Sequence, residues 1–130
     1  MLFRSVEADA NDSARLLQVI RQMEFPLVLL FNHGRVMTLP QGISKATGLH
    51  SALDMLRLSP RNTLAIGDAE NDHELLRLAE IGAAVEWGSA ALQATADVLV
   101  KGSGPAAVAD YVRGLAKTGQ IGRASCRERV

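Results

Sequence analysis

Residues 1–39 show first a helical and then a strand pattern of apolar positions. One predicted helix carries three apolar side chains on one face, at Leu16, Ile20 and Met23. Pro26 ends this helix, and the apolar runs 27–31 and 36–39 then flank a polar turn. This part of the chain is therefore predicted to form a helix followed by a β-hairpin.

From residue 40 onward, helical spacing and short apolar runs follow one another. A helix from residue 45 carries its apolar stripe at Leu49, Ala52, Leu53 and Leu56. An apolar strand at 64–67 leads through a tight turn into a helix at 72–80, which Gly82 is predicted to end in a left-handed conformation. An Ala-rich helix after Ser89 and a last helix from Pro105 complete the α/β pattern.

The strand at 64–67 runs directly into an acidic loop, Asp68-Ala69-Glu70-Asn71-Asp72. Ligands of open α/β sheets bind beyond the carboxyl ends of the strands, where Asp68 and Asp72 can face the same point. Two such carboxylates repel each other unless a cation lies between them, and hard oxygen ligands favour Mg²⁺. The alternative is that Asp68 caps the helix and Asp72 is a first-turn acid, each contributing about 1 kcal/mol.

Lys45 is predicted to lie in the first turn of the helix that Ser44 caps. The positive end of the helix dipole makes a cation unfavourable at this position. The placement is explained if an anion binds beside Lys45. A solvated lysine at a frayed helix end is the alternative.

The segments Gly42-Ile43-Ser44-Lys45-Ala46 and Gly67–Asp72, in this order and spacing, resemble the third and fourth motifs of the haloacid dehalogenase superfamily of phosphatases, in its Cof-type form. The resemblance covers about residues 27–115 and includes a strand at 82–85 and the segment 96–100. It implies a three-layer, Rossmann-like α/β core with parallel strands in residues 40–117. Residues 1–39 would then be the C-terminal end of an α/β cap domain.

For the intact protein, the resemblance implies a Mg²⁺-dependent phosphatase that hydrolyses a phosphate monoester through an aspartyl-phosphate. Lys45 would be catalytic and hold a phosphoryl oxygen, and Asn71 would bind the substrate. Asp68 would be a metal ligand, and Asp72 would serve the metal or order Lys45. The implied partner is a small phosphorylated metabolite. A phosphomutase or a sugar-phosphate phosphatase would share these residues, and a non-catalytic phosphate-binding or structural domain is the alternative from a different class.

The first and second motifs of the family have no match in the chain. Asp9 and Asn11 do not form the D-x-D of the first motif, because the third position is Asn and polar residues interrupt the preceding run. No nucleophile is therefore assigned, and the chain is expected to be an inactive C-terminal fragment. His33 is interpreted as an exposed turn residue, with a substrate contact as the alternative. Trp87 is interpreted as a packing residue, with a place in the lining of a substrate pocket as the alternative.

Composition and charge exclude several classes of partner. Fourteen basic and 14 acidic residues give a net charge of zero, which argues against nucleic acid or an anionic membrane as a partner. The chain has no signal-peptide pattern and no apolar run of the roughly 18 to 20 residues that span a membrane, so a cytoplasmic protein is expected. Residues 118–130, which include the only cysteine, Cys126, resemble a translated sequencing adapter and are expected to be non-native. The sequence does not determine the oligomeric state.

Overall fold

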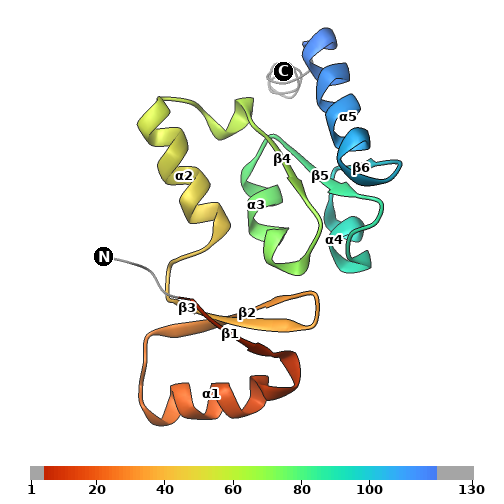
Figure 1. Ribbon diagram of the computed structural model, residues 1–130. Coiled ribbons are helices and arrows are strands. Elements are labelled where there is room, and N and C mark those ends of the chain that lie inside the picture. The colour runs from red at the N-terminus through yellow and green to blue at the C-terminus, as the bar shows by residue number, and fades with distance from the viewer. Residues whose placement is uncertain (1–4, 120–130) are drawn as a thin grey trace.

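The computed structural model describes residues 5–119, which contain two three-stranded sheets with helices around them (Figure 1). The antiparallel sheet has the order β1-β3-β2, with β1 at Val6–Asp9, β2 at Leu27–Asn32 and β3 at Arg35–Pro40. The parallel sheet has the order β4-β5-β6, with β4 at Leu64–Gly67, β5 at Ile81–Val85 and β6 at Val98–Val100. The predicted α/β fold with parallel strands is confirmed.

The antiparallel sheet is covered on one face by α1 (Ser13–Gln22), which follows a short 3-10 turn, η1 (Ala10–Asp12) (Figure 1). Ile20 from α1 and Val36 from β3 are buried. The register pairs Asn32 with Arg35, so β2 and β3 are joined by a turn of two residues. The helix and the hairpin therefore form where the sequence predicted them, and β1 adds a third strand to the hairpin.

The parallel sheet has helices on both faces. Its helices are α2 (Lys45–Leu56), α3 (His73–Leu78), α4 (Ala90–Thr95) and α5 (Gly104–Thr118), with 3-10 turns η2 (Pro60–Asn62) and η3 (Glu70–Asp72). One core cluster joins the strands to α3 and α4 through Ala65, Leu76, Ala84 and Leu92. A second cluster joins the opposite face to α5 through Ala83, Val85, Val100, Val108 and Tyr111. The predicted three-layer arrangement is thus confirmed.

One edge of β4 pairs with β5 from Leu64 opposite Ile81 to Gly67 opposite Ala84. Within residues 5–119, no strand pairs with the other edge of β4. Because β4 ends at Gly67, the acidic loop leaves the sheet directly beside this unpaired edge.

The predicted role of Gly82 as a left-handed helix end is wrong. Helix α3 already ends at Leu78, the backbone of Ala79 is extended, and Gly82 lies inside β5. A Cβ at Gly82 would lie 2.7 Å from the carbonyl oxygen of Leu76, and the Gly82 N–H donates to the Asp97 carboxylate at 2.8 Å. Glycine is therefore required here because a helix passes close to the strand, not because the backbone turns.

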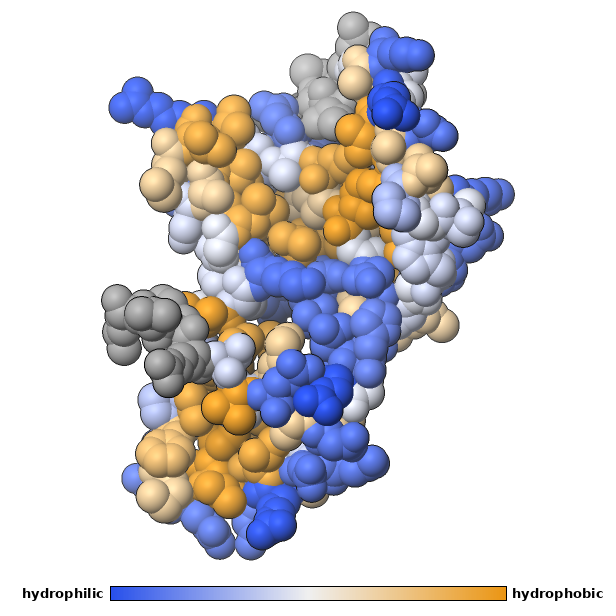
Figure 2. Space-filling view, viewed as in Figure 1, coloured by the Kyte–Doolittle hydropathy of each residue, from blue (hydrophilic) through white to orange (hydrophobic). Residues whose placement is uncertain are grey.

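Apolar side chains gather on the exposed face of α2 and the loop after it, at Met55, Leu56 and Leu58 (Figure 2).

Among the described residues, no helix is both long and apolar enough to cross a membrane. Helix α5 ends at Thr118, and Gly119 follows it with a φ of +58°. From residue 120 onward, the predicted non-native tail lies outside the described residues, and the domain boundaries at residues 39 and 117 stay predictions.

Candidate functional site

The carboxyl ends of β4 and β5 open onto a pocket of 310 Å³. Its lining combines three charged residues with apolar ones and one glycine: Lys45, Ile66, Gly67, Asp68, Asp72, Leu75, Val85 and Trp87. The pocket lies where ligands bind to parallel sheets, beyond the ends of the strands. A larger hollow of 530 Å³ beside β6 and α5 contains none of the predicted site residues.

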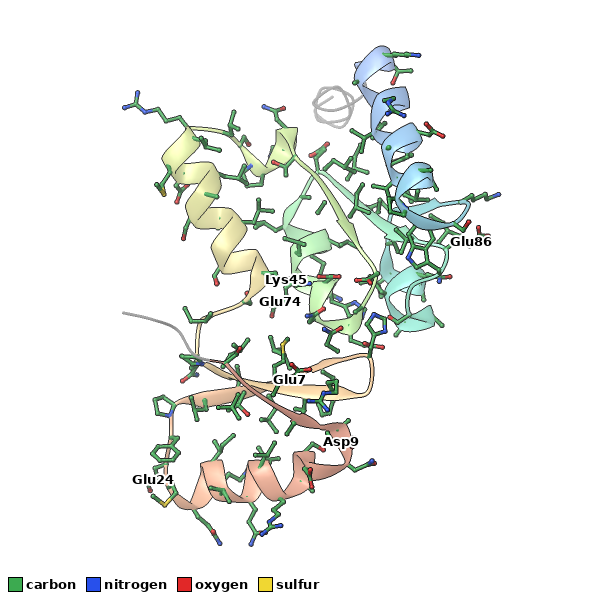
Figure 3. All side chains as sticks on the ribbon, viewed as in Figure 1. Glu7, Asp9, Glu24, Lys45, Glu74 and Glu86 are labelled. Carbon is green, nitrogen blue, oxygen red and sulfur yellow. The ribbon has the colours of Figure 1, made fainter. Side chains whose placement is uncertain are left out.

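Lys45 is positioned by a hydrogen-bonded cap at the start of α2. The hydroxyl of Ser44 accepts a hydrogen bond from the backbone N–H of Thr47, and the hydroxyl of Thr47 accepts one from the backbone N–H of Ser44 at 2.9 Å. This reciprocal pair is a capping box, which fixes the first helical turn. The predicted N-cap is thus confirmed, and Lys45 lies at the end of α2 that is near the acidic loop and above the antiparallel sheet (Figure 3).

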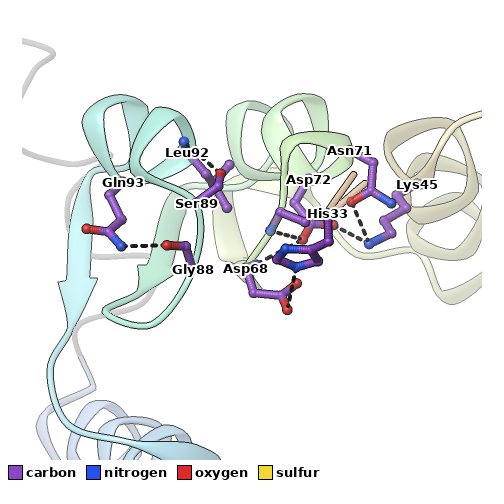
Figure 4. A network of polar contacts seen from close by, with 10 residues as sticks. His33, Lys45, Asp68, Asn71, Asp72, Gly88, Ser89, Leu92 and Gln93 are labelled. Atoms are coloured by element: carbon purple, nitrogen blue, oxygen red, sulfur yellow. Dashed lines mark hydrogen bonds and ion pairs between the residues drawn. The ribbon is translucent and has the colours of Figure 1, made fainter. Parts of the chain in front are cut away.

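The ammonium group of Lys45 contacts two side chains of the acidic loop (Figure 4). It forms an ion pair with Oδ1 of Asp72 and lies 3.4 Å from Oδ1 of Asn71. The other carboxylate oxygen of Asp72 accepts hydrogen bonds from the backbone N–H groups of Asp68 at 3.0 Å and Ala69 at 3.3 Å. Asp72 therefore ties the first turn of α2 to the end of β4.

Asp72 is only 2% exposed, so the contacts of its carboxyl group, and not water, determine whether the group is ionised. Burial alone would raise the pKa of the Asp72 carboxyl, but hydrogen bonds from Lys45 and from the backbone N–H groups of Asp68 and Ala69 hold it below its ordinary value. Asp72 is thus a carboxylate at neutral pH. A buried charge of this kind is stable only with such partners.

Asp68 presents its carboxylate to solvent, with 54% of the side chain exposed. Its Oδ2 lies 3.5 Å from Nε2 of His33, the first residue of the turn between β2 and β3 (Figure 4). His33 and Gly34 both have positive φ angles, +45° and +76°, as a two-residue hairpin turn of this type requires. The sequence predicted the turn but not the contact, because the contact depends on how the two sheets are placed.

Glu70 and Ser89 flank this contact. The pKa of Glu70 is lowered, mainly by a hydrogen bond from its own backbone N–H, with further contributions from His33 and from the hydroxyl of Ser89. The backbone N–H of Ser89 also donates to the carbonyl oxygen of Asp68 at 2.8 Å. The loop after β5 is therefore bound to the acidic loop after β4.

Trp87 lies in the loop between β5 and α4 and lines the same pocket as Lys45 and Asp68. Trp87 is 45% exposed, so the structure favours the interpretation of Trp87 as a pocket residue over that of a packing residue. The sequence predicts that Trp87 follows a strand. Periodicity does not extend into a loop, so it does not predict which way the side chain of Trp87 points.

The chemistry of the site fits a magnesium ion at Asp68. Mg²⁺ is commonly held by one or two carboxylates together with phosphate oxygens and water. Asp68 offers a half-exposed carboxylate, whereas both oxygens of Asp72 already accept hydrogen bonds. In residues 5–119, no three His, Cys, Asp or Glu side chains form a group that could hold a metal by themselves. Of the two carboxylates, Asp68 is therefore the one that is accessible to a cation, whereas Asp72 is engaged with Lys45 and the backbone.

Comparisons with known proteins agree with this fold. A family model of haloacid dehalogenase-like hydrolases matches residues 2–112. The chain is 41% identical over 73 residues to "Endoribonuclease YBEY, chloroplastic" of Arabidopsis thaliana, a match that covers 56% of this chain and 12% of that protein. It is 44% identical over 62 residues to "Phosphoglycolate phosphatase" of Natronomonas pharaonis, which covers 48% of this chain and 27% of that protein.

A solved structure shows the same fold. The match to the structure of the subclass IIB sugar phosphatase BT4131 covers 88% of this chain and 43% of that protein. Its TM-score is 0.69, and the sequence identity is 18%. The chain spans less than a third of the length of the two curated relatives described above. Because the family match extends over most of the sequence, the chain belongs to the haloacid dehalogenase-like hydrolases.

Proposed function

We propose that the chain is part of a Mg²⁺-dependent phosphatase that hydrolyses the phosphate monoester of a small metabolite. One observation carries this proposal: Asp72 and Asn71 hold the ammonium group of Lys45 in the pocket that Asp68 also lines. A fixed cation suits a phosphate oxygen, and a nearby exposed carboxylate suits a metal ion. Membership of a hydrolase family and a relative named phosphoglycolate phosphatase support the proposal.

Lys45 acts by binding a phosphoryl oxygen and stabilising the charge that grows there in the transition state. Its contribution depends on position, because a donor that is already oriented needs no reorganisation during the reaction. Asp72 supplies this orientation from a buried position, and its lowered pKa keeps it ionised. Asn71 lies beside Lys45 and has an amide group that can donate to the same phosphate.

Asp68 is the metal ligand of the proposed site, and Mg²⁺ bound there supplies positive charge that offsets the charge of the phosphate. The carboxylate of Asp68 is oriented by its backbone, since its N–H is bound to Asp72 and its carbonyl oxygen to Ser89. Lys45 and a metal ion at Asp68 would thus both place positive charge beside a phosphate group in this pocket.

The reaction also needs a nucleophile, a role that we assign to no residue of this chain. A carboxylate oxygen attacks phosphorus, the ester P–O bond breaks and the alcohol leaves; water then cleaves the acyl phosphate and restores the carboxylate. A strand that carried this carboxylate would fit the edge of β4 that is unpaired in residues 5–119. The 130-residue chain alone is accordingly proposed to be inactive.

Two other functions share the residues described. A phosphomutase or a sugar-phosphate phosphatase would use Lys45, Asn71 and Asp68 in the same way and would differ in the organic group that it accepts. A non-catalytic domain would bind phosphate with the same residues and never have the nucleophile. Sequencing the DNA upstream of Met1 separates the enzymes from the non-catalytic domain, because an in-frame D-x-D after an apolar strand supports an enzyme. Product analysis separates a phosphomutase from a phosphatase.

The proposed phosphate site is tested by binding to the 130-residue chain. Inorganic phosphate is titrated by calorimetry in the presence of millimolar Mg²⁺, and Mg²⁺ is titrated separately. We expect Lys45→Ala to weaken phosphate binding about tenfold or more, and Asp68→Asn to weaken Mg²⁺ binding. Lys101→Ala, which removes an exposed lysine outside the pocket, is the control and should bind as the unsubstituted chain does. Equal phosphate affinities in Lys45→Ala and Lys101→Ala would contradict the proposal.

A further inference from the structure

The loop that carries Trp87 is held by hydrogen bonds on both sides of the tryptophan. The amide nitrogen of Gln93, on α4, donates to the carbonyl oxygens of Glu86 and Gly88, each at 2.9 Å. The backbone N–H of Glu86 donates to Val100 at 3.0 Å, and that of Gly88 to Val85 at 3.0 Å. Trp87 is thus an exposed aromatic residue on a backbone that is fixed before and after it.

Gly88 and Ser89 of the same loop lie close to the backbone of Asp68 (Figure 4). A Cβ at Gly88 would lie 2.7 Å from the carbonyl oxygen of Asp68 and 3.0 Å from its Cα, so only glycine allows this approach. Ser89 then donates its N–H to that carbonyl oxygen. Since both Trp87 and Asp68 line the pocket, the backbone that carries the indole is held beside the proposed phosphate site.

The pocket is charged at one part of its wall and apolar at another. Lys45, Asp68 and Asp72 supply the charges, whereas Trp87 joins the apolar residues Ile66, Leu75 and Val85. A large aromatic side chain left 45% exposed on a rigid loop has apolar surface available to a ligand. Small-molecule sites commonly combine such a wall with a few polar groups that fix orientation.

We propose that Trp87 is a specificity-determining residue that packs against an apolar face of the organic group of the phosphate ester. This inference rests on the proposed phosphatase function and adds to it the chemical class of the preferred leaving group. Esters whose organic group presents a flat apolar face, such as an aryl or sugar ring, bind more tightly than esters of equal charge without one.

The chain itself contains the reporter for this contact, because Trp87 is its only tryptophan. In the unsubstituted 130-residue chain with Mg²⁺, phenyl phosphate and glucose 6-phosphate should change the tryptophan fluorescence on binding. Glycerol 1-phosphate, which has a phosphate but no ring, should bind about tenfold more weakly than phenyl phosphate, the scale of discrimination that an apolar contact supplies. The two ring esters also separate an aryl from a sugar preference.

Calorimetry with variants then assigns the preference to Trp87. Trp87→Ala should lose most of the difference between phenyl phosphate and glycerol 1-phosphate and leave inorganic phosphate binding within about twofold. Phe31→Ala is a matched control, since Phe31 is also aromatic and 46% exposed but lies outside the pocket, on β2. This control should keep the full preference.

The outcomes distinguish this inference from the proposed function on which it rests. If inorganic phosphate binds through Lys45 but ring and ringless esters bind equally, or Trp87→Ala keeps the preference, the role of Trp87 is refuted and the phosphate site stands. If no phosphate compound binds to the chain in the presence of Mg²⁺, both the proposed function and the role of Trp87 are refuted.

Discussion

Asp72 binds Lys45 with one carboxylate oxygen and the backbone of Asp68 with the other. A single buried side chain therefore sets the position of both the cation and the exposed carboxylate of the candidate site. The three residues come from two separate elements, the start of α2 and the loop after β4. Any change at Asp72 should consequently alter both the stability of the fold and the geometry of the site.

Replacing Asp72 by Asn should destabilise the protein because it leaves Lys45 without its charged partner while the buried position stays polar. We expect the free energy of unfolding to fall by about 1–3 kcal/mol, the usual range for a buried group that loses a charged hydrogen bond. Urea denaturation measures this change. Asp54→Asn is the control, since Asp54 is exposed and its pair with His50 contributes little. A loss no larger than in Asp54→Asn would contradict the role of Asp72.

The stability of the protein should depend on Asp72 at acid pH. Because the folded-state pKa of the Asp72 carboxyl is depressed below its ordinary value, the folded state favours the ionised form. The stabilisation is present above the unfolded pKa and is lost as the pH falls through the folded one. Comparing urea midpoints at pH 6 and pH 3 should show a smaller loss in Asp72→Asn than in the unsubstituted chain. An identical pH dependence would refute this assignment.

Gly67 should be intolerant of any side chain because it adjoins Asp72. A Cβ at this position would lie 2.6 Å from Cβ and 2.8 Å from Oδ2 of Asp72. Gly67→Ala should therefore displace the carboxylate and lower the free energy of unfolding by about 1–3 kcal/mol, as overpacking usually does. Gly48→Ala is the matched control, because Gly48 lies in α2 with no atom near the added methyl group. That control should gain about 0.5–1 kcal/mol.

The elements around the site were predictable because their signals are local. The strand at β4, the hairpin of β2 and β3 and the apolar stripe of α2 follow short-range periodicity. The cap at Ser44 likewise needs only residues of the same turn. The resemblance in motif order then indicated the three layers, which local patterns alone do not determine.

The features that were missed depend on contacts between distant segments. Gly82 was assigned to a helix end, but its absence of a side chain serves the close approach of Leu76 to β5. His33 meets Asp68 only because two different sheets lie side by side. The loop that places Trp87 at the pocket is held by hydrogen bonds from Gln93 on α4. None of these contacts has a signature in the spacing of residues along the chain.

Thr38 is half-buried, and its buried hydroxyl has no hydrogen-bond partner within the described part of the chain. An unsatisfied buried hydroxyl destabilises the folded state, so an apolar group of the same shape should be tolerated well. Thr38→Val is expected to raise the free energy of unfolding by up to about 1 kcal/mol, measured by urea denaturation. Thr47→Val should instead lose about 1 kcal/mol, because the hydroxyl of Thr47 completes the cap of α2. Destabilisation by Thr38→Val would show that its hydroxyl is bonded in solution.

The 130-residue chain should show no phosphatase activity. Lys45, Asn71 and Asp68 can bind a phosphate and a metal ion, but binding does not form the covalent bond that the proposed reaction requires. Loss of the nucleophile from a concerted site typically lowers turnover by several powers of ten, and what remains comes from binding and charge stabilisation. The measurement is an assay with a generic aryl phosphate and millimolar Mg²⁺.

Two variants distinguish activity of this chain from that of a contaminating phosphatase. Lys45→Ala and Asp68→Asn should give the same background rate as the unsubstituted chain, because none of the three proteins completes the reaction. A rate that both substitutions abolish would show that the chain is an enzyme by itself. The nucleophile would then be a carboxylate excluded on its sequence context, and Asp9 and Asp12, which lie at the end of β1 and in η1, would be the first to replace by Asn.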